Sequence, residues 1–289
     1  MTIALQLAIN GILLGGVLAL SALGFNIIFG VMRVVNLAHG DFVVLAAVFG
    51  AYAFAQFGIN PLLLLPLTIG AGFVAGALIH RFLLRRLPGE VASAEASSLT
   101  LTFGLSYFLA GAGIATFGGR FVSVPYLTGA FQLGAIEIPQ ARLLAFVVAT
   151  LLSLLFAYVL RSTVVGRAIR ATSQNLDGAL ACGVDVDRVR TLGFAIGTAV
   201  ATAAGTLMSF LFNLNAQQGV LFTVNAFAVV VIGGLGNYTG AVLGALILGL
   251  TESFASYFLG ATLAEAAPYL LFILVLLFAP AGLLGRRAR

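Results

Sequence analysis

Residues 4–29 read ALQLAINGILLGGVLALSALGFNIIF, a long run without a charged side chain. A helix needs about 20 mainly apolar residues to cross the hydrocarbon core of a bilayer, so this run predicts a membrane-spanning helix. Similar runs continue along the chain and predict an all-α fold, a polytopic bundle of transmembrane helices in a single domain over residues 1–289. They lie at about 41–57, 62–84, 98–118, 142–160, 191–212, 224–260 and 266–284.

The composition excludes a soluble protein. Hydrophobic residues make up 61% of the chain and charged residues only 8%, against roughly a quarter charged in a typical soluble domain. Too few polar side chains are present to cover a water-soluble surface, so membrane lipid is the expected solvent. The net charge of +5 is explained by the excess of arginine in the cytoplasmic loops of membrane proteins, and we expect no nucleic-acid partner.

Most of the 14 basic residues fall into three clusters that we expect on the cytoplasmic side. Clusters on one side must be joined by an even number of crossings, which requires the run at 224–260 to form two segments. As one helix it would be about 55 Å long, against a hydrocarbon core of about 30 Å, and residues 233–240, GGLGNYTG, are a poor helix interior. The resulting topology has an external N-terminus and about eight full spans plus one short or re-entrant segment. The clusters are Arg81, Arg85 and Arg86; Arg161, Arg167, Arg170, Arg188 and Arg190; and Arg286, Arg287 and Arg289.

A polar corner joins the first two runs, with the sequence GFNIIFGVMRVVNLAHGD ending at Asp41. Polar groups are costly inside lipid and are therefore candidates for function. We assign Asn26, Asn36, His39 and Asp41 to a substrate pathway and expect Arg33 to pair with Asp41. The alternative is a tight cytoplasmic corner whose charges lie among the lipid headgroups.

Glu252 is a second candidate for the substrate pathway, because it falls about 14 residues beyond the glycine-rich break and thus within the membrane. The alternative is a structural carboxylate bonded to a neighbouring helix, with Ser253 and Ser256 close by.

The longest hydrophilic stretch covers residues 161–190. Asn175 or Asp177 can cap a short helix through Ala181, and Gly183 suits its C-terminal end. The stretch therefore predicts ordered short helices at the cytoplasmic surface. It is either an ordinary positively charged loop or a docking surface for a cytoplasmic partner.

Small residues recur at every fourth position in two stripes, a spacing that lets helices approach closely in lipid. They predict packing within the chain or, alternatively, a seam between two copies. The stripes are Gly11, Gly15 and Ala19, and Ala241, Ala245 and Gly249.

The sequence contains no Walker A, HExxH, GxSxG or dinucleotide-binding motif. The GGLG stretch lacks the GK[ST] ending of a phosphate-binding loop. We therefore expect neither an enzyme nor a cofactor or metal bound by this chain.

Three stretches resemble signature regions of one family, the permease subunits of branched-chain amino acid ABC importers. They are FNIIFGVMRVVNLAHGDFVVLAA, GRAIRATSQNLDGALACGVDVDRVRTLGFAIGTAVATAAGTL and FAVVVIGGLGNYTGAVLGALILGLTES. They occur in the family's order, and the resemblance covers essentially the whole chain.

The resemblance implies a multi-pass subunit of the bacterial inner membrane that imports branched-chain amino acids by alternating access. Its implied partners are two cytoplasmic ATPase subunits that hydrolyse the ATP, a second permease that is homologous or identical, and an extracytoplasmic solute-binding protein. Residues of about 162–190 would form the ATPase-coupling loop, with Arg167, Arg170, Asp177 and Gly183 as the chosen contacts.

Other readings remain open at this point. Relatives with the same pattern are also associated with urea and short amides. A stand-alone channel or secondary transporter would share the broken helices and polar groups, although little charge lies within the spans. A membrane-embedded enzyme would need clustered acid, base or metal-ligating groups.

Overall fold

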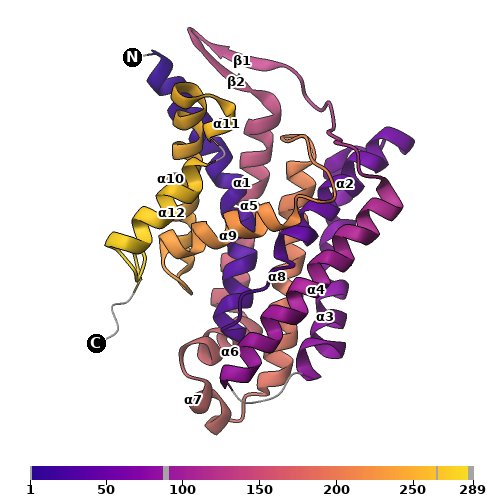
Figure 1. Ribbon diagram of the computed structural model, residues 1–289, viewed down its shortest axis with the longest axis vertical. Coiled ribbons are helices and arrows are strands. Elements are labelled where there is room, and N and C mark those ends of the chain that lie inside the picture. Colours follow the sequence, from indigo (N-terminus) through magenta and orange to yellow (C-terminus); the bar gives the residue numbers. More distant parts are fainter. Residues whose placement is uncertain (1, 87–90, 265, 286–289) are drawn as a thin grey trace.

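Two helices, α1 and α8, form the centre of a helical bundle in this computed structural model (Figure 1), which describes residues 2–86, 91–264 and 266–285. Within its most apolar window α1 is 83% buried and α8 is 78% buried, whereas α4 and α5 are each 22% buried. The all-α, polytopic fold class is confirmed. In chain order the elements are α1 (Thr2–Met32), α2 (His39–Phe57), η1 (Pro61–Leu64), α3 (Leu65–Phe82), η2 (Leu84–Arg86), α4 (Val91–Phe117), β1 (Ala130–Leu133), β2 (Ile136–Pro139), α5 (Gln140–Ser162), α6 (Val164–Gln174), α7 (Leu176–Ala181), α8 (Val186–Met208), α9 (Gly219–Gly233), α10 (Tyr238–Leu259), α11 (Ala261–Ala264) and α12 (Ala267–Phe278).

The predicted division of the run at 224–260 is confirmed. Helix α9 ends at Gly233 and α10 begins at Tyr238, and Gly234 and Gly236 between them have φ values of 104° and 78°. The Asn237 side chain accepts a 3.1 Å hydrogen bond from the Gly240 N–H and so caps α10. Helix α9 lies across the bundle rather than along it (Figure 1).

Seven helices of the described chain are long and apolar enough to span a membrane, and α9 and α12 are shorter. The last run was expected to be a full span, but α12 has only 12 residues, about 18 Å. It ends at Phe278 because the next residue precedes Pro280, and a residue before proline is driven out of helical geometry. The chain then folds against α9, where Leu283 N–H bonds to Ile232 O at 2.8 Å.

The two stripes of small residues pack against each other within the chain. A Cβ on Gly11 would lie 2.7 Å from Leu250 Cα, and one on Gly249 would lie 2.5 Å from the Gly11 oxygen. Such approach is possible only without side chains, so glycine sets the contact between α1 and α10. The packing interpretation of these stripes is confirmed.

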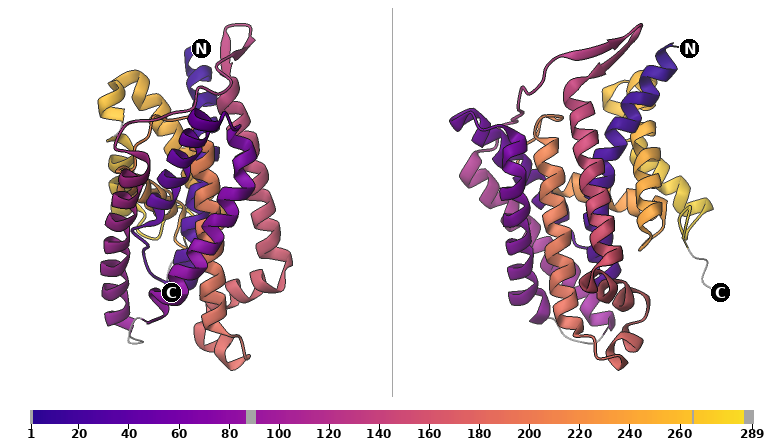
Figure 2. Two further views of the ribbon diagram at one scale, coloured as in Figure 1. Left: turned by 90° about the vertical axis from the view of Figure 1, so that its right-hand side faces the viewer. Right: turned by 180° about the vertical axis from the view of Figure 1, so that it is seen from behind.

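The two ends of the bundle differ. At one end the N-terminus meets the antiparallel β1–β2 hairpin (Figure 2), where the Gln6 side chain bonds the Glu137 backbone through both its amide nitrogen, at 2.6 Å, and its oxygen, at 2.8 Å. At the other end lie α6 and α7, and the Arg85–Asp187 ion pair of 3.1 Å brings the first two arginine clusters together. The third cluster, at 286–289, lies outside the described residues.

Candidate functional site

The polar corner predicted from the sequence turns back into the bundle. Helix α1 ends at Met32 because Arg33 has a φ of 58°, a left-handed geometry. Helix α2 then begins at His39, whose Nε2 lies 3.1 Å from the Ser21 carbonyl oxygen. Ser21 is about 16 Å from the end of α1, so α2 begins deep inside the protein.

We call residues 33–41 together with the first turn of α9 the central junction. Asn36, His39 and Asp41 are buried there. Buried polar atoms are nearly always hydrogen-bonded, yet three here have no partner among the described residues: Asn36 Nδ2, His39 Nδ1 and Asp41 Oδ2. The junction therefore offers both donors and acceptors to a polar molecule inside an apolar bundle.

Close backbone contact builds this junction. The Gly40 N–H donates to Thr223 Oγ1, and the Thr223 hydroxyl donates to the Leu37 carbonyl, each at 2.8 Å. A Cβ on Gly40 would overlap the Gly219 oxygen, and a Cβ on Gly219 would overlap the Asp41 carboxylate. The two glycines thus allow α9 to begin directly against α2.

The Asp41 carboxylate lies in the first turn of α2 and against Gly219, the first residue of α9. Helix N-termini carry a partial positive charge that stabilises anions. This arrangement, together with a hydrogen bond from the Ser106 side chain, explains how the bundle holds a buried carboxylate without a neighbouring arginine.

The expected Arg33–Asp41 pair is wrong. Arg33 is exposed, and its guanidinium donates instead to the Ser173 carbonyl oxygen in α6 at 3.1 Å. The left-handed residue at the end of α1 turns this side chain outward, while the following segment returns to the interior.

Asn26 lies apart from the other corner residues. Its Oδ1 accepts a 2.9 Å hydrogen bond from the Gly236 N–H and so holds the turn between α9 and α10. The structure therefore groups three of the predicted pathway residues and places Asn26 at the turn between α9 and α10.

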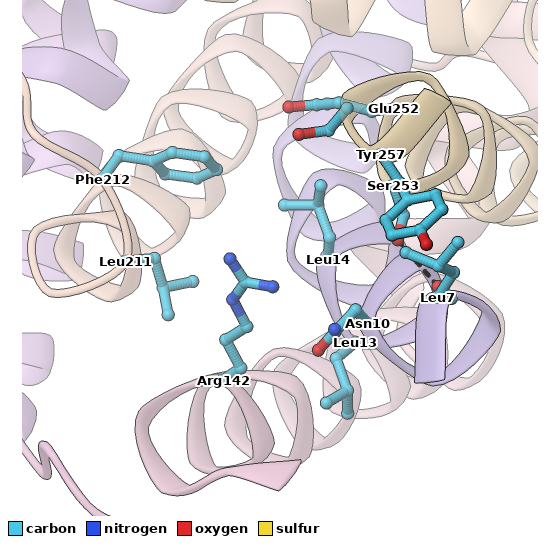
Figure 3. Close-up of a pocket in the computed structure, with 11 residues that line it drawn as sticks. Leu7, Asn10, Leu13, Leu14, Arg142, Leu211, Phe212, Glu252, Ser253 and Tyr257 are labelled. Atoms are coloured by element: carbon cyan, nitrogen blue, oxygen red, sulfur yellow. Dashed lines mark hydrogen bonds between the residues drawn. The ribbon is translucent and has the colours of Figure 1, made fainter. Parts of the chain in front are cut away.

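Glu252 lies elsewhere, in a cavity of about 360 Å³ between α1, α5, α10 and the residues that follow α8 (Figure 3). We call this the outer cavity, since it lies in the half of the bundle with the N-terminus and hairpin. Sequence reasoning missed two polar residues in its lining, Asn10 and Arg142. The available signal for Arg142 is its isolation from the three arginine clusters at the start of an apolar run.

The short helices predicted within residues 161–190 are present as α6 and α7. We call residues 163–185 the coupling surface, because the family resemblance predicts the ATPase-coupling loop there. Asn175, rather than Asp177, caps α7, because its Oδ1 accepts from the Gly178 N–H at 2.9 Å. Gly183 has a φ of 75°, and the Val184 N–H bonds to Ala179 O at 3.0 Å, which closes the helix.

The four residues predicted to contact a partner differ in their surroundings. Arg167 donates to the Ser162 carbonyl at 3.2 Å, and the partly buried Arg170 donates to the Leu160 carbonyl, so both bind the C-terminal end of α5. Asp177 and Gly183 are exposed. The two arginines therefore position α6 against α5, and the aspartate and the glycine face outward.

Exposed apolar side chains accompany these residues on the coupling surface. Val164 is 71% exposed, Leu180 54% and Leu176 38%, while Ile169 is buried against α1, α5 and α8. One face of α6 thus packs on the bundle, and apolar groups remain uncovered on the other side of the coupling surface.

Comparison with known proteins gives consistent matches. Residues 7–280 match the family model of the permease component of the branched-chain amino acid transport system. The high-affinity branched-chain amino acid permease protein LivH of Salmonella typhimurium is 32% identical, over 98% of this chain and 96% of LivH. The corresponding BraD protein of Pseudomonas aeruginosa is 29% identical over the same shares.

Two further matches are more distant. The autoinducer 2 import system permease LsrC of Yersinia pseudotuberculosis is 30% identical, over 82% of this chain and 66% of LsrC. The solved structure of PsaBC from Streptococcus pneumoniae in complex with Fab aligns with a TM-score of 0.51 at 14% identity, covering 96% of this chain and 92% of that one. The latter shows a shared fold.

Proposed function

Because the chain belongs to the permease components of branched-chain amino acid transport systems, we propose that it is the membrane-spanning subunit of an ATP-driven importer. It moves branched-chain amino acids, or a related small polar solute, across the bacterial inner membrane. Two cytoplasmic ATPase subunits hydrolyse the ATP, a second permease completes the pathway, and an extracytoplasmic protein delivers the solute.

The coupling surface carries this proposal. It combines capped, ordered helices with exposed Val164, Leu176 and Leu180 at the end of the bundle opposite the N-terminus. Uncovered apolar groups beside charged ones are typical of a protein interface. A stand-alone channel or secondary transporter has no need of such a surface.

Movement of the coupling surface has a direct route to the centre. Ile169 of α6 packs with Val31 of α1, and Ser173 of α6 receives the hydrogen bond from Arg33. Arg33 begins the segment that enters the central junction. A shift of α6 driven by the ATPases would therefore pull on residues 33–38.

The central junction is the proposed constriction of the solute pathway. Asn36, His39 and Asp41 place unpaired polar atoms there, and the backbones of α2 and α9 are in close contact at Gly40 and Gly219. Separation of these two helix ends would expose polar atoms to the solute on one side at a time, as alternating access requires.

Reconstitution tests the proposal. The chain is placed in vesicles with its ATPases, partner permease and binding protein, and ATP-dependent accumulation of labelled leucine is compared with that of labelled urea. Leucine uptake that needs every component supports the importer, and urea uptake instead keeps the mechanism and changes the substrate. Uptake by this chain alone, without ATP, would contradict the proposal in favour of a channel or secondary transporter.

A further inference from the structure

The outer cavity has charged groups of opposite sign on facing walls. Figure 3 shows the guanidinium of Arg142 reaching in from α5 and the carboxylate of Glu252 from α10. Asn10 of α1 also lines the cavity, and its Oδ1 is buried without a hydrogen-bond partner among the described residues. This polarity is placed for a ligand that carries both charges.

We propose that the outer cavity is a binding site for a free zwitterionic α-amino acid. This inference rests on the proposed function. Arg142 binds the carboxylate, and Glu252 with Asn10 binds the ammonium group. An arginine fork matches the two oxygens of a carboxylate, and a carboxylate and an amide oxygen both accept hydrogen bonds from an ammonium group.

The remaining wall fits an aliphatic side chain. Leu13, Leu14, Leu211 and Phe212 line the cavity beside the charged groups. A volume of about 360 Å³ is within the range of about 300–1,000 Å³ that is usual for small-molecule sites. The cavity thus combines a charged end and an apolar end, as does a branched-chain amino acid.

The wall between α1 and α10 is held rigidly. The Ser253 hydroxyl donates to the Leu7 carbonyl at 2.7 Å, and the close approach of Gly11 and Gly249 fixes the two backbones. Glu252 therefore has a defined position relative to Asn10, and a preorganised site loses less free energy on binding.

A fluorescent reporter tests this site directly, because the chain contains no tryptophan. The full chain with Phe212→Trp is placed in phosphatidylglycerol nanodiscs and titrated with leucine. We expect a saturable change in emission. Arg142→Gln and Glu252→Gln should each weaken binding by about tenfold or more, since a hydrogen bond to a charged group is lost.

Matched controls separate local from general effects. Arg161→Gln removes the same side chain from the opposite end of α5, and Glu137→Gln removes a carboxylate from the hairpin. Both should leave leucine binding unchanged. A loss of binding in these controls equal to that in the cavity variants would overturn the proposal.

Ligand analogues give a second test. Isoamylamine lacks the carboxylate of leucine and 4-methylpentanoate lacks its ammonium group, so each should bind the reporter chain at least about tenfold more weakly. Arg142→Gln should abolish the difference between leucine and isoamylamine. Equal binding of leucine and both analogues would overturn the proposal.

A zwitterionic lipid headgroup is the competing ligand for the outer cavity. In phosphatidylethanolamine nanodiscs, leucine should still produce the signal. A signal caused by this lipid alone, which leucine does not displace, would assign the cavity to a headgroup and overturn the proposal. Leucine uptake with an unchanged KM in Arg142→Gln would contradict this inference alone, whereas cavity binding without ATP-dependent uptake would contradict only the importer function.

Discussion

The central junction buries the side chains of Asn36, His39 and Asp41, whereas most polar side chains of the coupling surface are exposed. In the junction, buried atoms of Asn36, His39 and Asp41 have no hydrogen-bond partner in the described chain, and the fit is so close that Gly40 and Gly219 have no room for a side chain. On the coupling surface, Asn175 caps its own helix and apolar groups are exposed instead. This contrast is what the proposed importer requires, namely a rigid surface that transmits movement and a polar contact that opens.

The largest effect is expected from filling the junction. Gly40→Leu would drive its side chain into the backbone of Gly219 and Thr223, so we expect complete loss of ATP-dependent uptake. Gly104→Leu, in α4, is the matched control because open space surrounds that position. Uptake by Gly40→Leu equal to that of the control would show that α2 and α9 need not meet.

Removal of the buried charge should have the next largest effect. Asp41→Asn keeps the shape but loses the attraction to two helix N-termini, which is worth up to about 2 kcal/mol, or roughly 30-fold in an equilibrium. We expect uptake to fall by about that factor, measured at equal membrane expression. Glu137→Gln, in the β1–β2 hairpin, serves as the control for loss of a carboxylate. Undiminished uptake by Asp41→Asn would show that transport does not require the charge of Asp41.

Deformation of the coupling surface comes third. Gly183→Val forces a branched side chain into left-handed geometry at φ 75°, at a cost of about 1–2 kcal/mol. We expect solute-stimulated ATPase activity of the complex to fall about tenfold while the chain still inserts. Gly183→Asn, which tolerates this geometry, should keep most of the activity, and similar losses in both variants would indicate a contact rather than a backbone requirement.

The smallest effect is expected from loss of a cap. Asn175→Ala removes the acceptor for the Gly178 N–H, worth about 1 kcal/mol, and should reduce stimulated ATPase activity severalfold. Hydrogen exchange should rise in α7 and stay unchanged in the central junction. Exchange that rises equally in both regions would contradict the rigid coupling surface.

The sequence correctly predicted the features that depend on residues close together in the chain. Apolar run lengths located the helices, and the glycines at 233–236 located the break between α9 and α10. The Arg33–Asp41 pair was expected because an unpaired charge within the membrane is costly, but one left-handed residue turns Arg33 outward to α6. Arg142 and Glu252 are 110 positions apart, so only the packing of α1 with α5 and α10 brings them to one cavity.

The glycine contact between α1 and α10 also constrains biosynthesis. Each residue of α10 is synthesised about 230 residues after its neighbour in α1. At 5–20 residues per second, this delay lasts roughly 10 to 50 seconds. During that time the first helix is in the membrane with Asn10 and its small-residue face uncovered by their final neighbour. A chain truncated before α10 would keep this face exposed permanently, which makes such fragments natural targets for membrane quality control.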